Sequence, residues 1–103
     1  MVIRLARDGA LHLDAPEDFK RFKVVVEDAG RDVSRARAAL AKVARLEDAA
    51  TAWVAEAALR GWAGVKNDSV WQDGLTAMIA KAAPHGWVDA ATGAIKAHVE
   101  WVA

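Results

Sequence analysis

The most regular pattern of apolar and polar residues lies in residues 31–60, where it has the period of a helix. At 100° per residue, one side is apolar and consists of Val33, Ala36, Leu40, Val43, Ala50, Val54 and Ala58. The opposite side carries Arg31, Arg35, Lys42, Arg45, Glu56 and Arg60. The stretch has neither glycine nor proline, and its many alanines favour a helix because they lose no side-chain entropy there. We therefore predict one long amphipathic helix, with Asp32 or Ser34 as its N-cap.

This pattern lapses at Leu46-Glu47-Asp48, where Glu47 falls in the middle of the apolar side. Two outcomes are open. A straight helix would exceed the diameter of a compact domain of this size and would offer part of its length to a second subunit. Alternatively, the helix breaks near Glu47. We favour the unbroken helix.

Residues 2–14 have the period of two that is typical of a strand. Two alternating segments flank Asp8-Gly9, whose residues tolerate the positive φ of a tight hairpin turn. The predicted buried face consists of Ile3, Leu5, Leu11 and Leu13. The predicted outer face consists of Arg4, His12 and Asp14.

Two further helices are predicted on either side of the long one. In residues 14–30, Asp14 and Glu17 resemble a capping box, and Gly30 ends the helix. Its apolar side consists of Phe19, Phe22, Val26 and Ala29. In the second, Ser69 and Gln72 form another capping-box signature, and Pro84 and Gly86 end the helix. Its apolar side consists of Trp71, Leu75, Met78, Ile79 and Ala82.

Residues 87–102 are predicted to form a second hairpin, with a type I turn and glycine bulge at residues 89–93. Its last strand alternates Ile95, Ala97, Val99 and Trp101 with Lys96, His98 and Glu100. The sequence thus predicts a single α+β domain over residues 1–103. In it, the N- and C-terminal hairpins form an antiparallel sheet packed against about three helices, one of them long.

Composition narrows the class of protein. Hydrophobic residues make up 54% of the chain, which is typical of a globular domain. Fourteen Lys and Arg balance fourteen Asp and Glu, so nucleic acid and anionic membranes are not favoured partners. The basic run between residues 31 and 45 is interpreted as a solvated face. We expect a cytoplasmic protein, because cysteine, a secretion signal and an apolar run long enough to span a bilayer are all missing.

Glu47 and the pair His98 and Glu100 are the candidate catalytic residues. A carboxylate on an apolar helix face takes up a proton through a raised pKa, which suits acid or base catalysis, and Thr51 lies one turn away. The alternative is that Glu47 is wet or paired with Arg37 or Arg45. His98 and Glu100 share a strand face, with Lys96 beside them and His12 expected on a neighbouring strand. Alternating charges are also the ordinary pattern of a solvated sheet face.

Five tryptophans and no tyrosine form the aromatic set beside two phenylalanines. Trp53, Trp62 and Trp71, with Thr51, are the candidate ligand-binding residues, because tryptophan is enriched in pockets and interfaces. The alternative is that all the tryptophans lie in the core. The three histidines lack ligand spacing, so we predict no metal site, and the absence of a nucleotide-binding motif predicts no cofactor.

Two functions fit these observations. The first is a small homodimeric binding or regulatory protein with a Trp-rich apolar interface or groove, which takes a partner or a small apolar ligand. The second is a cofactor-independent isomerase, lyase or hydrolase that acts on an apolar carbonyl compound through Glu47 or His98. The sequence leaves open whether the protein is an enzyme. We favour the binding protein, because dimers are common and catalysis by one isolated acid is demanding.

Overall fold

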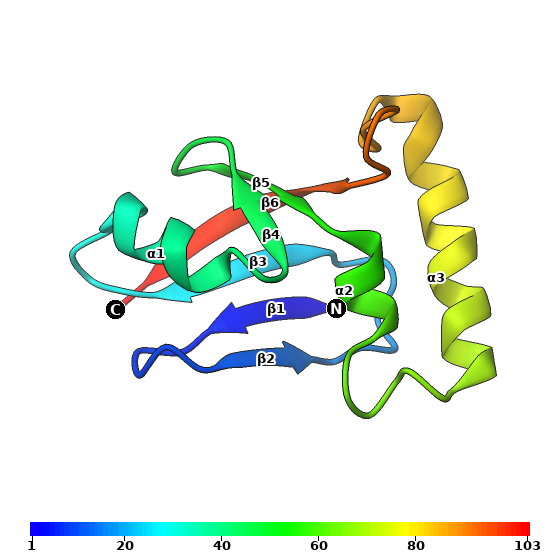
Figure 1. The fold of residues 1–103 in the computed structure, drawn as a ribbon, viewed down its shortest axis with the longest axis horizontal. Coiled ribbons are helices and arrows are strands. Elements are labelled where there is room, and N and C mark those ends of the chain that lie inside the picture. Colours follow the sequence, from blue (N-terminus) through cyan, green and yellow to red (C-terminus); the bar gives the residue numbers. More distant parts are fainter.

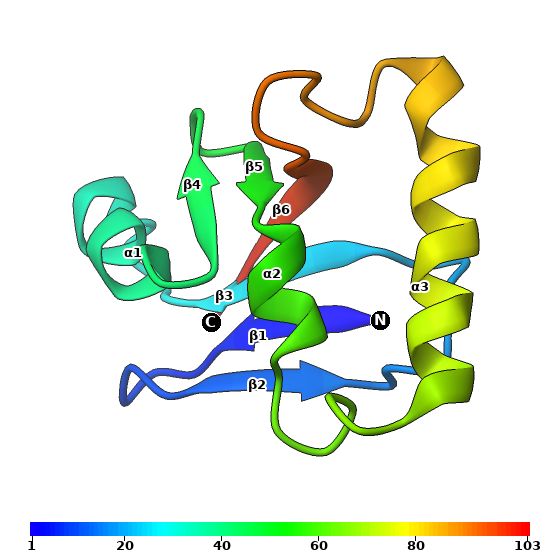
Figure 2. The same cartoon turned by 45° about the vertical axis from the view of Figure 1, so that its right-hand side comes forward.

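A computed structural model describes all 103 residues, and its fold is α+β (Figure 1). The elements, in chain order, are β1 (Val2–Leu5), β2 (Leu11–Asp14), β3 (Lys23–Glu27), α1 (Val33–Leu40), β4 (Ala44–Leu46), β5 (Thr51–Val54), α2 (Glu56–Arg60), α3 (Ser69–Ala82), the 3-10 turn η1 (Ala83–His85) and β6 (Ile95–Val102). The six strands form one curled sheet in the order β2-β1-β3-β6-β5-β4. Helix α2 lies over one face of this sheet, and α3 crosses one end of it (Figure 2).

The sheet is mixed, which corrects the prediction of an antiparallel sheet built from two terminal hairpins. Strand β3 pairs parallel with both β1 and β6, whereas the pairs β1–β2, β5–β6 and β4–β5 are antiparallel. Parallel neighbours are joined by long connections and not by tight turns. The sequence pattern of a single strand does not reveal them.

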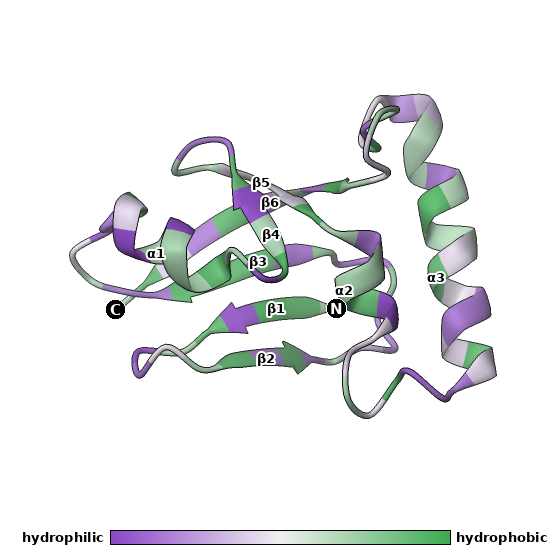
Figure 3. Ribbon diagram, in the orientation of Figure 1, coloured by the Kyte–Doolittle hydropathy of each residue, from purple (hydrophilic) through white to green (hydrophobic).

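The N-terminal hairpin is confirmed in both its pairing and its faces. Ile3 is opposite Leu13 and Leu5 is opposite Leu11, so these four apolar residues share one side. On the other side Arg4 donates a 2.7 Å hydrogen bond to the Asp14 carboxylate. Hydrophobic and hydrophilic bands alternate along the strands in Figure 3, as expected for a sheet with one buried face.

The long helix predicted over residues 31–60 is wrong. Asp32 caps α1 by accepting from the Arg35 backbone N–H at 3.1 Å, which confirms one of the two predicted caps, but the helix ends at Leu40. Strands β4 and β5 and the short α2 follow. Glu47 stands in the turn between β4 and β5, so the pattern did lapse at a real boundary. Alanine is apolar in a helix or a strand alike, and pairing of β5 with β6 decided for strands.

The helix predicted over residues 14–30 is also wrong, because this segment contains β3. The run Val24-Val25-Val26 is β-branched, and such side chains fit a strand better than a helix. Val24 and Val26 are buried on the inner face, at 0% and 1% exposure. Phe19 and Phe22 lie in the loop before β3 and pack against the core.

The third predicted helix is confirmed as α3, with a different cap. The Asp68 side chain accepts from the Trp71 backbone N–H at 3.0 Å, so the N-cap is Asp68 and Ser69 is the first helical residue. Trp71 and Leu75 face the core, and Pro84 and Gly86 follow the helix as predicted.

The C-terminal hairpin is confirmed only in its second strand and its turn. In β6, residues 95, 97 and 99 are buried and residues 96, 98 and 100 are exposed. The turn closes through the Gly93 N–H and the Asp89 carbonyl at 2.7 Å. The first arm contributes a single bridge, between Val88 and Ile95, and β6 pairs instead with β3 and β5.

The core lies between the inner face of the sheet and the helices, and it contains no polar or charged residue. Ile3, Val24, Val54 and Ile95 supply it from the sheet, at 0–2% exposure. Burial of this apolar surface is the main force that holds the helices on the sheet. None of the helices is both long and apolar enough to cross a membrane.

Candidate ligand-binding groove

A groove of about 600 Å³ runs along one side of α3, a volume that suits a small organic molecule. Three separate segments build it: the loop before β3, the helix α3, and the stretch from Trp87 to the start of β6. Its lining residues are Phe19, Lys20, Phe22, Gly74, Ala77, Met78, Lys81, Ala82, Trp87, Ile95 and Lys96. Buried Ile95 and Ala82 belong to the core, so the groove reaches from solvent to the core surface.

Phe19 packs directly on the backbone of α3 because the helix has a glycine at that point. A Cβ added to Gly74 would lie 2.5 Å and 2.6 Å from two carbons of the Phe19 ring, closer than any side chain tolerates. The Phe19 ring also contacts Trp71, with ring centroids 6.0 Å apart. Glycine in a helix interior costs stability relative to alanine. Here it brings an aromatic wall of the groove against the helix.

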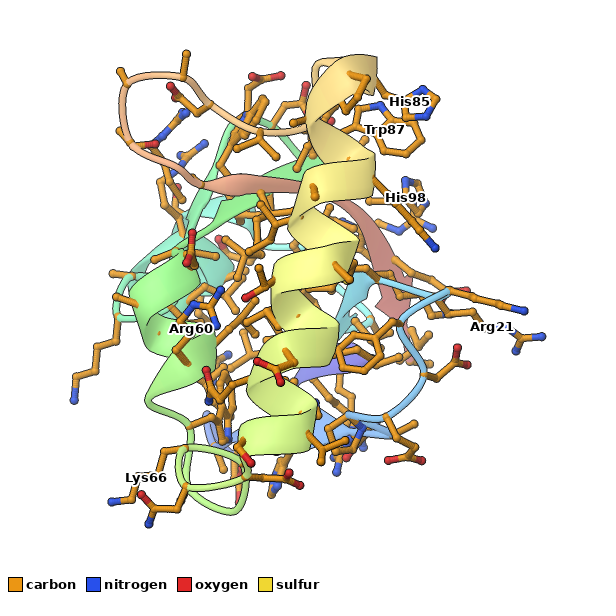
Figure 4. The ribbon with its side chains drawn as sticks, turned by 90° about the vertical axis from the view of Figure 1, so that its right-hand side faces the viewer. Arg21, Arg60, Lys66, His85, Trp87 and His98 are labelled. Carbon is orange, nitrogen blue, oxygen red and sulfur yellow. The ribbon has the colours of Figure 1, made fainter.

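Trp87 lines the groove while leaving 47% of its surface exposed, the highest exposure among the large aromatic residues. Its backbone is held at both ends, because its N–H donates to Ala82 and its carbonyl accepts from Lys96 at 2.7 Å. The His85 ring stacks on it with centroids 4.4 Å apart and an interplanar angle of 21°. Figure 4 shows this stacked pair at one end of α3, with His98 on the same side of the helix.

All the charged residues of the groove lining are cations. Lys20, Lys81 and Lys96 line the groove, and none of them forms an ion pair. Two other cations of the sheet are paired: the Lys23 ammonium lies 2.7 Å from the Glu100 carboxylate, and Arg4 lies between Asp14 and Glu27. The chain has no net charge, so the unpaired lysines make a local excess of positive charge.

A second cavity, of about 470 Å³, differs in its charges. It lies where β1 and β3 end, beside α1, and its lining includes Arg7 and Arg35 together with Asp8, Glu27 and Asp28. Opposite charges there offset one another. The groove along α3 is therefore the site with the more distinct chemistry.

Glu47 does not lie on the apolar helix face predicted for it. It is exposed in the turn between β4 and β5, and its carboxylate accepts from the Trp53 indole N–H at 3.0 Å. Arg37 donates to the Leu46 carbonyl and not to Glu47. The premise of a carboxylate buried among apolar neighbours is wrong, because the helix that would have buried it does not form.

His98 and Glu100 are exposed on the outer face of β6, next to Lys96 as predicted. The hydrogen bond from Lys23 lowers the pKa of Glu100 from its ordinary 4.5, so this carboxylate is a stronger acid than usual. His12 is not on a neighbouring strand, since β1 and β3 separate β2 from β6. No three His, Asp or Glu side chains are close enough to share a metal ion.

The four predicted ligand-binding residues lie in different places. Trp71 is buried in the core and donates its indole N–H to the Pro16 carbonyl at 2.8 Å. Trp62 follows α2 and packs against the core. Trp53 and Thr51 are half-buried on β5, where Thr51 is opposite His98. None of them lines the groove along α3.

The sequence reasoning predicted none of the groove residues as ligand-binding residues, and Trp87 is the most exposed aromatic residue among them. It directly follows the helix-ending sequence Pro84-His85-Gly86, at the start of the stretch predicted as the second hairpin, and not on the apolar side of a helix. That placement is the signal that distinguishes it from Trp71. The comparisons with known proteins add no second line of argument: no family model, no curated protein and no solved structure matches this chain.

Proposed function

We propose that this protein is a binding protein that takes a small apolar ligand in the groove along α3. The observation that carries the proposal is a groove of ligand size with an exposed tryptophan at its rim and a wall built by the Phe19–Gly74 contact. Binding pockets for small molecules are concave and mostly apolar, with a few polar groups. The apolar surface of Phe22, Met78 and Trp87 would leave water when the ligand enters.

The alternative, a cofactor-independent enzyme, has less support. An enzyme of that kind needs a base or acid within hydrogen-bond reach of the bound substrate. Glu47, Glu100 and His98 do not line the groove. Lysines and apolar groups do, and they provide attraction and burial for a ligand.

The predicted homodimer remains a prediction with a weaker basis. Its first reason was a helix too long for one small core, and that helix is absent. Light scattering tests the dimer independently of the ligand: twice the mass of one chain supports it, and the mass of one chain dismisses it.

The proposed function is tested with the neutral fluorescent probe phenylnaphthylamine, whose emission rises when it leaves water. We expect saturable binding to the wild-type protein. In Ala77→Trp, an indole placed on the groove side of α3 should fill the site and weaken binding about tenfold or more, because the apolar contact area is lost.

Ala80→Trp is the matched control, since Ala80 is also exposed on α3 but does not line the groove. We expect its affinity for the probe to equal that of the wild type. Equal weakening in both variants, or no saturable binding to the wild type, would contradict the proposed function.

A further inference from the structure

We infer that the ligand of this groove is a small organic anion, an apolar body that carries one acidic group such as a carboxylate or sulfonate. The inference rests on the proposed function and adds the chemical class of the ligand. Its basis is the charge of the lining: three lysines and no carboxylate line an otherwise mostly apolar groove.

The groove lysines take no part in the ion pairs of the molecule. All four ion-pair contacts engage Arg4, Lys23 or Arg60 as the cation, and none involves a groove lysine. A lysine ammonium on its flexible stem gains from an anionic partner and needs no fixed geometry to find one. The groove lysines have no such partner within the protein, so a ligand anion would be their first.

The three lysines come from three different segments of the chain. Lys20 comes from the loop before β3, Lys81 from the last turn of α3, and Lys96 from β6. These three elements are the same ones that supply the apolar lining. An apolar ligand body that packs against Met78 and Trp87 would therefore have one lysine near it from each of the three segments that build the groove.

The size and the apolar walls of the groove limit which anion fits. A groove of about 600 Å³ with apolar walls suits a body of one or two rings or a short acyl chain. A fully hydrated inorganic ion would leave those walls without a partner, and a cation of the same shape would meet like charge. The chemistry thus selects an amphipathic acid over a neutral or basic analogue.

Two probes with the same ring skeleton test this inference. Anilinonaphthalene sulfonate differs from phenylnaphthylamine by its one anionic group, so their affinity ratio isolates the charge. We expect the sulfonate to bind more tightly at low salt, and its advantage to shrink as salt screens the lysines. Dodecanoate should displace it, whereas dodecyltrimethylammonium at equal concentration should not.

The double variant Lys20→Gln/Lys81→Gln locates the effect. We expect the affinity for the sulfonate to fall about fivefold, because each exposed charge pair contributes only modestly to binding. The affinity for phenylnaphthylamine should stay within about twofold. The control Lys42→Gln/Lys66→Gln makes the same change in net charge at exposed positions outside the groove and should leave both affinities unchanged.

These experiments distinguish a failure of the anion inference from a failure of the proposed function. Equal affinities for the two probes, or equal losses in both double variants, would overturn the anion while leaving the apolar ligand in place. If neither probe binds, or if Ala77→Trp leaves both affinities unchanged, the proposed function itself fails and the inference fails with it.

Discussion

The two sides of α3 differ in how their polar groups are satisfied. On the side toward α2, the Arg60 guanidinium donates to Glu56, Gln72 and Thr76 at 2.7–3.3 Å, and the Gln72 amide donates back to the Arg60 and Val65 carbonyls. On the other side the groove lysines have no partners. Figure 4 shows Arg60 between α2 and α3, and His85 with Trp87 on the opposite side of α3.

The two sides of α3 thus have different proposed roles, one in stability and one in binding. A network whose donors and acceptors all meet within the protein fixes the position of α3 against α2. Unpaired cations around exposed apolar surface contribute little to folding and leave their interaction energy for a partner. Substitutions toward α2 should therefore change stability, whereas substitutions of the groove lysines should change binding.

The largest effect is expected at Leu75, a fully buried residue on the core-facing side of α3. Leu75→Ala should lower the free energy of unfolding by about 2–5 kcal/mol, through lost burial and the cavity it leaves. Urea denaturation measures the change. Val70→Ala is the control on the same helix, since Val70 is 80% exposed and should matter little. Equal effects at both positions would show that α3 is not held by this apolar contact.

The second largest effect on stability is expected in the hydrogen-bond network between α3 and α2. Arg60→Ala removes the side-chain bonds to Glu56, Gln72 and Thr76, and should lower the free energy of unfolding by about 1–3 kcal/mol. Phenylnaphthylamine affinity at a temperature where the variant is folded should not change. An Arg35→Ala variant, exposed on α1, is the reference and should stay within about 0.5 kcal/mol of the wild type.

Gly74 lies on the groove side of α3, and the sign of the stability change on its substitution by alanine tests the contact with Phe19. Glycine to alanine in an ordinary helix interior stabilises by about 1 kcal/mol. Here the new methyl group would displace the Phe19 ring, so we expect Gly74→Ala to destabilise the protein by about 1 kcal/mol net and to weaken probe binding. A gain in stability in thermal or urea denaturation would show that Phe19 does not pack at this position.

The groove lysines should have the smallest effect on stability. Lys20→Gln/Lys81→Gln should change the free energy of unfolding by no more than about 0.5 kcal/mol, because neither side chain has a partner in the folded protein. The same variant should lose affinity for anilinonaphthalene sulfonate. A large loss of stability here would remove the contrast between the two sides of α3.

Lys23, which is paired with Glu100, should behave differently from the groove lysines. Its effect is measured by titration of Glu100. Lys23 lowers the pKa of Glu100, so this pair adds stability above the ordinary Glu value of 4.5 and loses it as pH falls through the lowered pKa. NMR titration of Lys23→Gln should show the Glu100 pKa rising toward 4.5. Lys20→Gln is the control and should leave the Glu100 pKa where it is in the wild type.

Part of the fold follows from local patterns in the chain. The N-terminal hairpin, the alternation along β6 and the apolar side of α3 were all predicted, and each has one dominant period over its whole length. In residues 31–60 the many alanines satisfied a helical period without excluding a strand. The β-branched run before Asp28 was outweighed by the spacing of Phe19 and Phe22. Both errors come from positions where one residue type suits two elements.

The groove was less predictable than the fold, because no single segment contains it. Sequence reasoning placed the ligand site among Trp53, Trp62 and Trp71, and those residues serve the sheet surface and the core. Phe19, Met78 and Trp87 are far apart in the chain. Their meeting depends on α3 crossing the end of the sheet, next to the loop before β3 (Figure 2).

From the amino-acid sequence alone came the α+β class, the turn and the two faces of the first hairpin, and the core-facing side of α3. These depend on side-chain periodicity and on turn and cap residues, which act over a few neighbouring positions. Three features became known from the folded structure: residues 31–60 divide into two helices and two strands, β3 lies parallel between β1 and β6, and three unpaired lysines surround one groove. Those features depend on contacts between distant segments, whose free energy exceeds the small local preference of an alanine-rich stretch.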